Sequence, residues 1–543
     1  MRQVFLLLAL VTTLGLSAQS AAPDNWWELD RTEDSFPGVS ASRAEAYLQG
    51  KKAEPVVVAV IDSGVDIEHE DLEGVIWTNP GEIPDNGIDD DKNGYVDDVH
   101  GWNFIGGRDG RNVNYENLEI VRLYNKYDAK YKNRNRDGLN KKEKAEYDAY
   151  QEYKQTIEKK QEELGPTAMQ YAMIKQAVDQ ALEELDKDPQ DVTAEDIANL
   201  ESQDETIAIV KQVVANATAS GATFAELYEQ LEGAQEYFDG QLKYNYNPEY
   251  DAREIVGDDP DNMKDRYYGN NDVEGPDASH GTHVAGIIAG THGNGIGVNG
   301  VGGTHVQIMS IRTVPNGDER DKDVANAIRY AVDNGAKVIN MSFGKGASPH
   351  KDAVDDAMKY AQKHDVLLVH AAGNDGKLLT LKNNYPNDTY QGKRRTGKTW
   401  IEVGAASSSY DDQLAAPFSN YNKRYVDVFA PGAQIYSTVP DDGYAKFDGT
   451  SMASPMVAGI AALLRSYFPD LKAQQVKEII EESALPVDLD VVKPGSEGEK
   501  IKFSELSATG GLANAYSAVK LAEQTKGKNR KLRDARDASL RQY

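Results

Sequence analysis

Cysteine is absent from this chain of 543 residues. A chain without thiols has no disulfide bonds, no thiolate metal ligands and no cysteine nucleophile. Any bound metal must therefore be held by oxygen or nitrogen atoms, and any covalent catalysis must use another residue. Serine, histidine and carboxylate side chains are the candidates for chemistry.

Positive charge is also scarce. The chain has 59 Lys and Arg residues against 88 Asp and Glu residues, and its formal net charge is -29. Such an acidic surface repels phosphate groups, so we expect no nucleic-acid partner. It suits a secreted protein or one that binds divalent cations.

Only one long hydrophobic run is present, from Val4 to Leu16, and small residues follow it up to Ala22. The run is too short to cross a bilayer, and it has the pattern of a secretory signal peptide over residues 1–22. An uncleaved anchor is the alternative. We expect export to the periplasm or the medium, with no membrane span in the mature chain and no compact pro-domain before Asp62.

Three distant fragments hold the parts of a hydrolytic site: VVVAVIDSGVDIEHEDL with Asp62, SHGTHVAGI with His280, and GTSMASPMVAG with Ser451. A serine hydroxyl is a weak nucleophile until an imidazole takes its proton, and that imidazole needs a carboxylate to orient it. Each residue alone also has an ordinary explanation in a turn or a packed helix. Together, in the order Asp, His, Ser, they indicate cleavage of acyl bonds.

The residues around each candidate fit this chemistry. Asp62 ends an apolar run that predicts a buried strand, and Ser451 falls where a helix is expected to begin. The backbone N–H at such a helix start favours negative charge and can meet an oxyanion. Asn374 in VHAAGND is the expected second donor. His283 has neither an HExxH motif nor a cysteine beside it, so a structural role is expected rather than metal binding.

Five blocks in this order resemble the subtilisin-like serine proteases, or subtilases: DSG at Asp62, HGTHVAGI at His280, INMSFG at Ile339, HAAGN at His370 and GTSMASP at Gly449. The resemblance extends from about Val56 to Lys520 around one long insertion. It implies peptide-bond hydrolysis through an acyl-enzyme, with Asp62 as orienting carboxylate, His280 as general base, Ser451 as nucleophile and Asn374 as oxyanion donor.

The same resemblance implies where a polypeptide substrate binds. Ser342, Phe343 and Gly344 would pair with extended substrate as an added strand, and Ala371, Ala372 and Gly373 would form a wall of the main specificity pocket. The opposite wall should lie near residues 316–320. Its acidic pair, Asp318 and Glu319, could select a basic substrate residue, but we favour a solvated acidic turn.

Alternating strand and helix patterns predict the fold class: an α/β protein whose parallel sheet is covered by helices on both faces. The predicted strands are Val56–Ile61, Val306–Ile311, Ala336–Met341, Val366–His370, Thr399–Val403 and Tyr425–Phe429. The predicted helices are His280–Gly290, Lys322–Asn334, Lys351–His364, Thr450–Tyr467, Leu471–Glu482 and Gly511–Ala522. The cleft of such a sheet lies at the carboxyl ends of its strands, where Asp62 falls.

A dense acidic loop, DNGIDDDKNGYVDD over residues 85–98, predicts structural calcium. Its oxygen ligands at alternating positions would be the side chains of Asp89, Asp91, Asn93 and Asp97 and the carbonyl of Tyr95. His100 stands where an EF-hand has glutamate, so the loop is not an EF-hand. An acidic turn without a metal is the alternative.

The resemblance implies a second calcium site, in which Asp71 is joined by the loop HGNGIGV. The ligands that it implies are Asp71, Asn294, Ile296 and Val298. His292 in this loop departs from the family pattern, and the long insertion precedes the loop, so its shape could differ.

The distance of 218 residues between Asp62 and His280 contains a charged, helical insertion from Asn114 to Tyr246. Apolar residues at helical spacing predict one helix that ends at Gly165 and Pro166, and another around Val178. Thr223 and Glu226 form the pattern of a capping box at the start of a third. This subdomain could be a lid, an arm that recruits substrate, a surface for a protein partner, or a passive appendage.

These patterns divide the chain into five parts. The signal peptide (1–22) precedes a catalytic domain in two pieces (23–113 and 247–524), which are separated by the insertion (114–246), and a basic tail (525–543) follows. A secreted serine endopeptidase, stabilised by calcium, is the first interpretation. A catalytically silent, calcium-dependent binding protein and an esterase with the same triad stay open as alternatives.

Overall fold

The centre of the molecule is a nine-stranded sheet with the order β10-β13-β7-β6-β5-β4-β1-β3-β2. The computed structural model describes residues 22–200, 205–390 and 397–525, so the predicted signal peptide up to residue 21 and the tail from residue 526 lie outside the described residues. The strands are β1 Val56–Asp62, β2 Gly101–Asn103, β3 Val306–Arg312, β4 Val338–Met341, β5 Leu367–Ala371, β6 Trp400–Ala406, β7 Val428–Pro431, β10 Leu485–Pro486 and β13 Gly511–Leu512.

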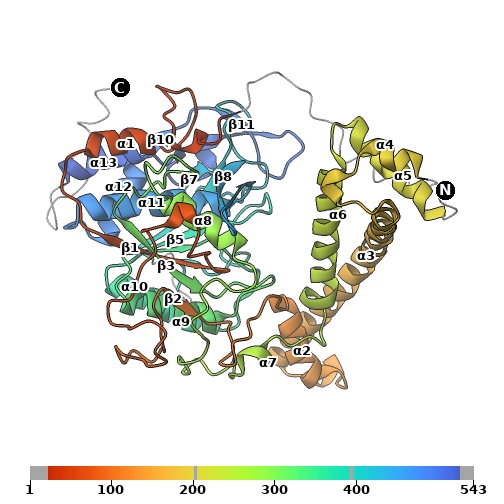
Figure 1. The fold of residues 1–543 in the computed structure, drawn as a ribbon. Helices are drawn as coiled ribbons and strands as arrows, with labels where there is room; N and C mark the ends of the chain where they lie inside the picture. The colour runs from red at the N-terminus through yellow and green to blue at the C-terminus, as the bar shows by residue number, and fades with distance from the viewer. Residues whose placement is uncertain (1–21, 201–204, 391–396, 526–543) are drawn as a thin grey trace.

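Neighbouring strands from β2 to β13 run parallel, and β10 alone pairs antiparallel at the edge. Their residues are buried on both sides because helices cover each face, as Figure 1 shows. One face carries α8 Ser279–Ala289, α11 Thr450–Tyr467, α12 Ala473–Ser483 and α13 Ala515–Gln524, and the other carries α9 Asp321–Asp333 and α10 Lys351–Lys363. The predicted fold class is confirmed, and each predicted strand or helix overlaps an observed one. Two bounds were wrong: strand β7 begins only at Val428, and Gly511–Leu512 at the start of a predicted helix form the strand β13.

The segment before β1 packs onto this core. It contains α1 Ala41–Leu48, and the Val39 carbonyl accepts a hydrogen bond from the N–H of Ala515 at the start of α13. Trp26 and Trp27 are fully buried, and their indole N–H groups donate to carbonyls of the segment that contains β8 Ile435–Val439. The strand β8 forms a hairpin with β9 Gly443–Phe447. A second two-stranded sheet joins β11 Asp490–Val492 and β12 Lys500–Lys502.

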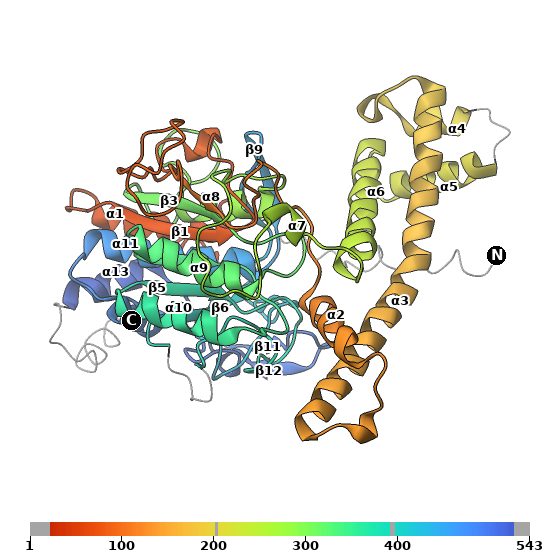
Figure 2. The ribbon, with the colours of Figure 1, turned by 90° about the horizontal axis from the view of Figure 1, so that it is seen from below.

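The insertion projects from one side of the core as a separate group of helices, as Figure 2 shows. Its helices are α2 Glu119–Tyr131, α3 Lys141–Leu185, α4 Ala194–Asn199, α5 Glu205–Ala219 and α6 Phe224–Asp239, and a π-helix, Gly240–Asn245, follows. Thr223 and Glu226 form the predicted capping box at the start of α6. The helical character predicted for the insertion is confirmed.

The predicted helix end at Gly165 and Pro166 is wrong, because α3 continues through both residues to Leu185. Proline fits helical φ values and removes one backbone donor, and packing on either side can hold such a helix together. Pro166 itself is exposed. Tyr150 packs in a tyrosine cluster before it, and Val178 packs in an apolar cluster after it.

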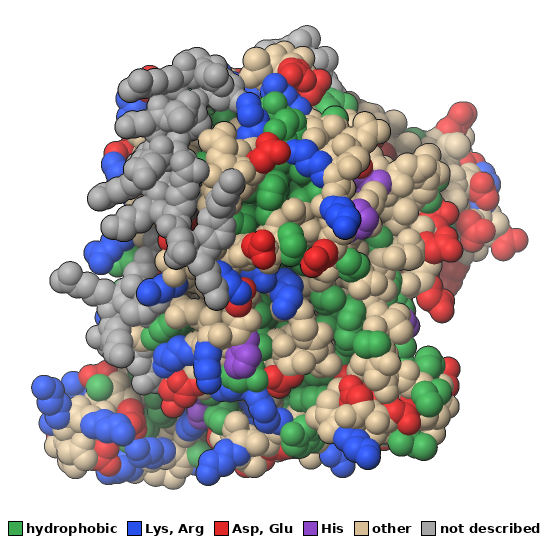
Figure 3. Space-filling model, turned by 90° about the vertical axis from the view of Figure 1, so that its left-hand side faces the viewer, with side chains coloured by type: hydrophobic (Ala, Val, Ile, Leu, Met, Phe, Trp, Pro, Cys, Tyr) green, Lys and Arg blue, Asp and Glu red, His purple; other side chains and the backbone are tan. Residues whose placement is uncertain are grey.

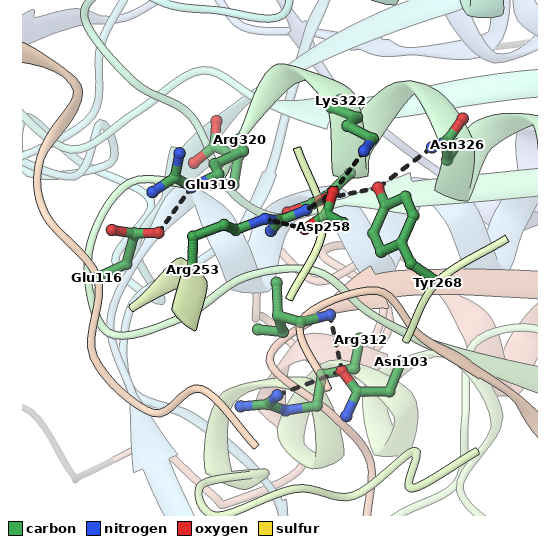
Figure 4. A network of polar contacts seen from close by, with 12 residues as sticks. Asn103, Glu116, Arg253, Asp258, Tyr268, Arg312, Glu319, Arg320, Lys322 and Asn326 are labelled. Carbon is green, nitrogen blue, oxygen red and sulfur yellow. Dashed lines mark hydrogen bonds and ion pairs between the residues drawn. The ribbon is translucent and has the colours of Figure 1, made fainter. Parts of the chain in front are cut away.

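A buried polar network fixes the chain where it returns from the insertion to the core (Figure 4). Arg253, in the short helix α7 Arg253–Val256, donates two hydrogen bonds of 2.7 and 2.8 Å to Asp323 of α9. The hydroxyl of Tyr268 donates to the same carboxylate, and Lys322 pairs with Asp258. Bidentate contacts of this kind hold a loop in one orientation.

Charged side chains of both signs are interspersed among the described residues on the face drawn in Figure 3. Among the residues that the structure describes, no helix combines the length and the hydropathy that a bilayer crossing needs.

Candidate active site

Asp62 and His280 meet although 218 residues separate them. Asp62 is the last residue of β1, and its side chain is 1% exposed, while His280 lies in the first turn of α8. The Asp62 Oδ1 and His280 Nδ1 atoms are 2.6 Å apart. Burial alone would lower the pKa of His280, but the charge and the hydrogen bond of Asp62 outweigh it, so the pKa of this imidazole is raised.

Close packing at a glycine makes this contact possible. A Cβ atom on Gly281 would lie 2.0 Å from the Gly64 carbonyl oxygen, so no larger side chain fits between α8 and the turn after β1. The N–H of Ser63 donates to Asp62 Oδ1 at 2.8 Å. The carboxylate is thereby fixed at the strand end, with its oxygen directed at the imidazole.

Ser451 lies in the first turn of α11, where its backbone N–H precedes the first intrahelical hydrogen bonds. Its hydroxyl donates to the carbonyl of Ser342 at 3.1 Å. This places the nucleophile candidate beside the predicted substrate-binding edge. In this conformation the hydroxyl is directed at Ser342 O, so it must rotate before a base can take its proton.

Asn374 follows β5 and is held against the start of α11. Its Oδ1 atom accepts hydrogen bonds from the N–H and the hydroxyl of Thr450, at 2.8 and 2.9 Å. This fixes the amide so that Nδ2 is left for another acceptor. A Cβ built on Gly449 would lie 3.3 Å from Asn374 Nδ2 and 3.5 Å from the Ser451 nitrogen, so the two donors are near each other.

A cavity of about 620 Å³ lies beside Ser451. The predicted binding residues that line it are Ser342, Phe343, Gly344, Ala371 and Gly373, and Asn374 and Ser451 line it as well. Ala372 lies behind this wall, fully buried. Ser342 joins the wall to α11, because its hydroxyl contacts the Ser451 carbonyl and the Ser454 hydroxyl, both at 2.8 Å.

Asn384 connects the wall at Ala371–Gly373 with the edge at Ser342–Gly344, and sequence reasoning missed it. Its Nδ2 donates to the carbonyls of Ala371 and Ala372, each at 3.2 Å. Its Oδ1 lies 2.3 Å from where a Cβ of Gly344 would be, so only glycine fits there. Asn384 lies outside the recognised blocks, ten residues after Asn374, and no sequence signal connects it with Gly344.

The opposite side of the cavity is formed by Gly317, Asp318 and Glu319, as expected for residues 316–320. The expectation of a solvated acidic turn is wrong for Glu319, which is only 2% exposed. Burial raises the pKa of Glu319 to about 8. Arg122 of the insertion and Lys345 both donate to the Glu319 carbonyl, and the pattern of local charges gave no sign of these contacts.

His283 has the structural role that was expected. Its Nε2 atom contacts the carbonyls of Ile435 and Ala445 at 2.9 and 3.1 Å, and burial lowers its pKa to about 4. The imidazole is therefore neutral and ties α8 to the β8–β9 hairpin.

Comparison with known proteins gives the same assignment as the motifs. The model of the subtilase family, Peptidase_S8, matches residues 53–517. The chain belongs to the subtilase family. Its matched region includes Asp62, His280, Asn374 and Ser451, together with the whole insertion.

Three curated relatives show how far the likeness to other subtilases extends. The chain is 38% identical over 276 residues to the thermophilic serine proteinase of Bacillus sp. (strain AK1), which covers 50% of this chain and 58% of the relative. It is 34% identical to the cell wall-associated protease of Bacillus subtilis (strain 168) over 232 residues, an alignment that covers 42% of this chain and 24% of the relative. It is 36% identical to thermitase of Thermoactinomyces vulgaris over 241 residues, an alignment that covers 44% of this chain and 74% of the relative. The chain thus spans less than two thirds of the first two relatives.

The acidic loop of this subtilase gathers a different set of carboxylates from the one predicted. Carboxylate oxygens of Glu82, Asp91 and Asp98 all lie within 4.8 Å of one another. Glu82 Oε2 is buried and has no hydrogen-bond partner among the described residues, and burial raises the pKa of Asp98 to about 6. Crowded, desolvated carboxylates of this kind fit a divalent cation.

The other predicted ligands of this loop have different contacts. Asp89 accepts backbone N–H bonds from Asn93 and Gly94, and Asp97 accepts them from Asn86 and Gly87. Asn93 donates through its amide to Asp91 and Asp98, which places it beside the carboxylate group. The Tyr95 side chain is buried, and its hydroxyl donates to the Arg266 carbonyl. Of the predicted carboxylate ligands, Asp91 is the one that joins the cluster, and Asn93 lies next to it; the Tyr95 carbonyl stays a prediction.

The residues that the resemblance implies for the second calcium site lie around Asp71, and the contacts among them run from N–H donors to its carboxylate. Asp71 is fully buried and accepts hydrogen bonds from the Asn294 amide at 2.6 Å and the Val298 N–H at 2.8 Å. The N–H of Ile296 donates to the Asn294 side chain. Burial raises the pKa of Asp71. A buried carboxylate at the centre of a loop fits a cation that would share its charge.

Proposed function

We propose that this subtilase is a serine endopeptidase that hydrolyses peptide bonds through an acyl-enzyme. The observation that carries the proposal is the 2.6 Å contact between Asp62 and His280, which joins a buried strand end to a helix start. A carboxylate in this place holds the imidazole in one tautomer and stabilises the imidazolium. Ser451 and Asn374 both line the cavity beside Ser342–Gly344.

In the proposed reaction, His280 takes the proton of the Ser451 hydroxyl as Oγ attacks the carbonyl carbon of the scissile bond. The oxyanion that forms is met by the N–H of Ser451 and by Asn374 Nδ2. His280 then gives the proton to the leaving amine, and the C–N bond breaks. Water, activated by the same imidazole, attacks the acyl-enzyme and releases the acid.

The substrate is proposed to be an extended polypeptide that lies along Ser342–Gly344. Strand addition supplies backbone hydrogen bonds, and the cavity next to Ser451 receives one side chain. The family match that extends to Ser342–Gly344 favours peptides over small esters, which need only the pocket. Two donors near the reacting carbonyl would each contribute, because loss of one costs about a hundred- to a thousandfold in turnover, as measured on a member of this family.

We also propose that the protein is exported and that calcium stabilises it. The sequence supports export through its signal-peptide pattern, and one relative is named a cell wall-associated protease. Glu82, Asp91 and Asp98 would hold one cation and Asp71 with its loop another. A bound cation would neutralise carboxylates that are costly to bury. A protein partner for the insertion stays a prediction.

Hydrolysis of casein by the purified protein tests this proposal, with Ser451→Ala as the matched variant and a small ester as second substrate. We expect casein to be cleaved by the wild type only. Equal cleavage by both proteins would reject Ser451 as nucleophile. Cleavage of the ester alone would favour an esterase, and no cleavage of either, with binding retained, would favour the silent alternative.

A further inference from the structure

The insertion is joined to the cavity by backbone pairing. The Asn316 N–H donates to the Asn114 carbonyl at 2.8 Å, and the Glu116 N–H donates to the Asn316 carbonyl at 3.2 Å. Tyr115 thereby forms a parallel bridge with Asn316. Residues 114–116, at the start of the insertion, therefore pair with Asn316, and the chain continues from there into Gly317–Glu319, which line the cavity.

Gly317 allows this approach. Its φ is +153°, and a Cβ there would lie 2.2 Å from the Glu116 carbonyl oxygen. A residue with a side chain at this position would push the two segments apart. The insertion and the cavity wall are thus packed against each other with no room for independent movement at this point.

Charged side chains continue the junction at the start of α2. The Glu119 N–H donates to the Asp318 carboxylate at 2.7 Å. Arg122, one turn later, donates to the Asp318 carbonyl at 2.9 Å and to Asn117 O at 2.6 Å, and its second nitrogen lies 3.3 Å from Glu319 O. The Arg122 side chain is 11% exposed. A forked, nearly buried guanidinium on carbonyl oxygens fixes the backbone that carries them.

Lys345 completes the connection from the other side of the cavity. It follows the predicted substrate edge Ser342–Gly344, and its ammonium donates to the Glu119 carboxylate and the Glu319 carbonyl, each at 2.7 Å. It also pairs with Asp321 at 2.9 Å, and the lysine side chain is 1% exposed. Arg320, which follows Asp318 and Glu319 in the chain, extends to Glu116 of the insertion (Figure 4). Its Nε atom lies 2.7 Å from a carboxylate oxygen of Glu116. Both sides of the cavity are therefore tied to α2.

We propose that the insertion is part of the substrate-binding site, and that Arg122 is a positioning residue that holds the Asp318–Glu319 backbone for the residues before the cut. This rests on the proposed function, because it assumes that a peptide lies in the cavity beside Ser451. Arg122 itself touches no reacting atom. It acts by keeping the second side of the cavity at a fixed distance from Ser342–Gly344.

Peptide length gives the test. A substrate with one or two residues before the cut reaches only the pocket next to Ser451, whereas one with four residues extends between the two sides. For Arg122→Met we expect kcat/KM to fall roughly tenfold on the four-residue peptide, mainly through KM, and to change less than twofold on the short one. The rate of labelling by a small fluorophosphonate should not change.

Two further variants separate positioning from general damage. Arg122→Lys keeps one donor and the charge, so it should restore part of the loss on the long peptide. Arg134→Met, an exposed arginine elsewhere in the insertion that pairs with Glu143, should change neither peptide. Far-UV circular dichroism of each variant confirms that the helices are intact.

Three results would overturn the inference: an equal loss on both peptides, no loss on either, or the same loss with Arg134→Met. Suppose that the wild type cleaves peptides and Ser451→Ala does not, while Arg122→Met has the same ratio of kcat/KM between the long and the short peptide as the wild type. The inference then fails, and the proposed function stands. If the wild type cleaves no peptide, the proposed function fails first.

Discussion

The sheet and the insertion are held together by different forces. The sheet is buried on both faces, and its core residues such as Ile339 and Val369 are fully inaccessible to water. The insertion has two small clusters, one of them mostly tyrosine, and an exposed, charged surface. Apolar burial dominates folding free energy, so the core should be the more stable unit. Polar contacts such as those of Glu119 with Asp318 and Lys345 hold the insertion against the core.

The largest expected effect falls on the core and spares the insertion. Asp62→Asn keeps the size of the side chain but removes the charge that raises the pKa of His280. We expect kcat to fall by roughly ten-thousandfold, the scale seen when the orienting carboxylate of such a triad is replaced. Measurement of kcat on a peptide between pH 6 and 10 checks this.

The pH profile of the same variant supplies the control. His280 must be neutral to act as a base, so wild-type activity should rise as the pH passes its raised pKa. That rise should move to lower pH in Asp62→Asn. An unchanged profile with full activity would contradict the role of Asp62.

A cavity placed in each region would sharpen the comparison. Ile339→Ala in the sheet should lower the free energy of unfolding by about 3 kcal/mol, and Leu231→Ala in the insertion by about 2 kcal/mol. All five tryptophans of the chain, at positions 26, 27, 77, 102 and 400, lie outside the insertion. Tryptophan fluorescence in urea therefore follows the core, while far-UV circular dichroism also follows the insertion.

We expect Leu231→Ala to produce an early loss of helical signal while the fluorescence transition keeps its midpoint. Ile339→Ala should move the fluorescence transition itself. If Leu231→Ala shifts both signals together, the two regions unfold as one unit, and the comparison drawn above is wrong.

Glu319 lies where the insertion meets the core, and its raised pKa should make the free energy of unfolding depend on pH. An unfolded glutamate ionises near pH 4.5, but the buried one keeps its proton up to about pH 8. The folded state therefore holds the extra proton between these values, and wild-type stability falls as the pH rises through them. Glu319→Gln cannot ionise, so relative to wild type it should gain on the order of 3 kcal/mol between pH 5 and pH 9.

Urea unfolding of Glu319→Gln and wild type at these two pH values gives the result. Asp470→Asn, at an exposed position, is the matched control and should show no such change. A constant difference between Glu319→Gln and wild type at both pH values would mean that Glu319 is ionised in the folded protein.

Removal of divalent cations should act on the core alone. Both predicted sites lie outside the insertion, and a cation held at a hundred times its dissociation constant contributes about 2.7 kcal/mol to stability. A chelator should therefore lower the fluorescence melting temperature of wild type, and this decrease should be smaller in Asp98→Asn. An unchanged melting temperature would argue against calcium at either site.

The sheet, and the residues Asp62 and His280 that meet at 2.6 Å, were predictable from sequence because both leave local patterns in it. Apolar runs such as Val56–Ile61 define buried strands, and the blocks around Asp62, His280 and Ser451 are contiguous. Continuous apolar runs of this kind are typical of strands buried on both faces, and β1 lies between β3 and β4 in the sheet. Asn374 was predictable because its block immediately follows a strand.

Residues that act through distant contacts were not predictable. Asn384 reaches Gly344, and Glu82 joins Asp91 and Asp98, only after the chain has folded. The Glu319 carbonyl accepts a hydrogen bond from Arg122, which lies in a helix that begins 200 residues earlier. Pro166 misled the helix assignment because a local rule on proline ignores the packing that holds α3 on both sides.

Labelling with a fluorophosphonate, followed by mass spectrometry of the digested protein, tests the central claim most directly. The claim is that Asp62 and His280 make Ser451 a nucleophile. We predict one adduct, on the peptide that contains Ser451, and a rate of labelling that falls in Asp62→Asn. An adduct on another serine, or equal labelling of Ser451→Ala, would contradict it.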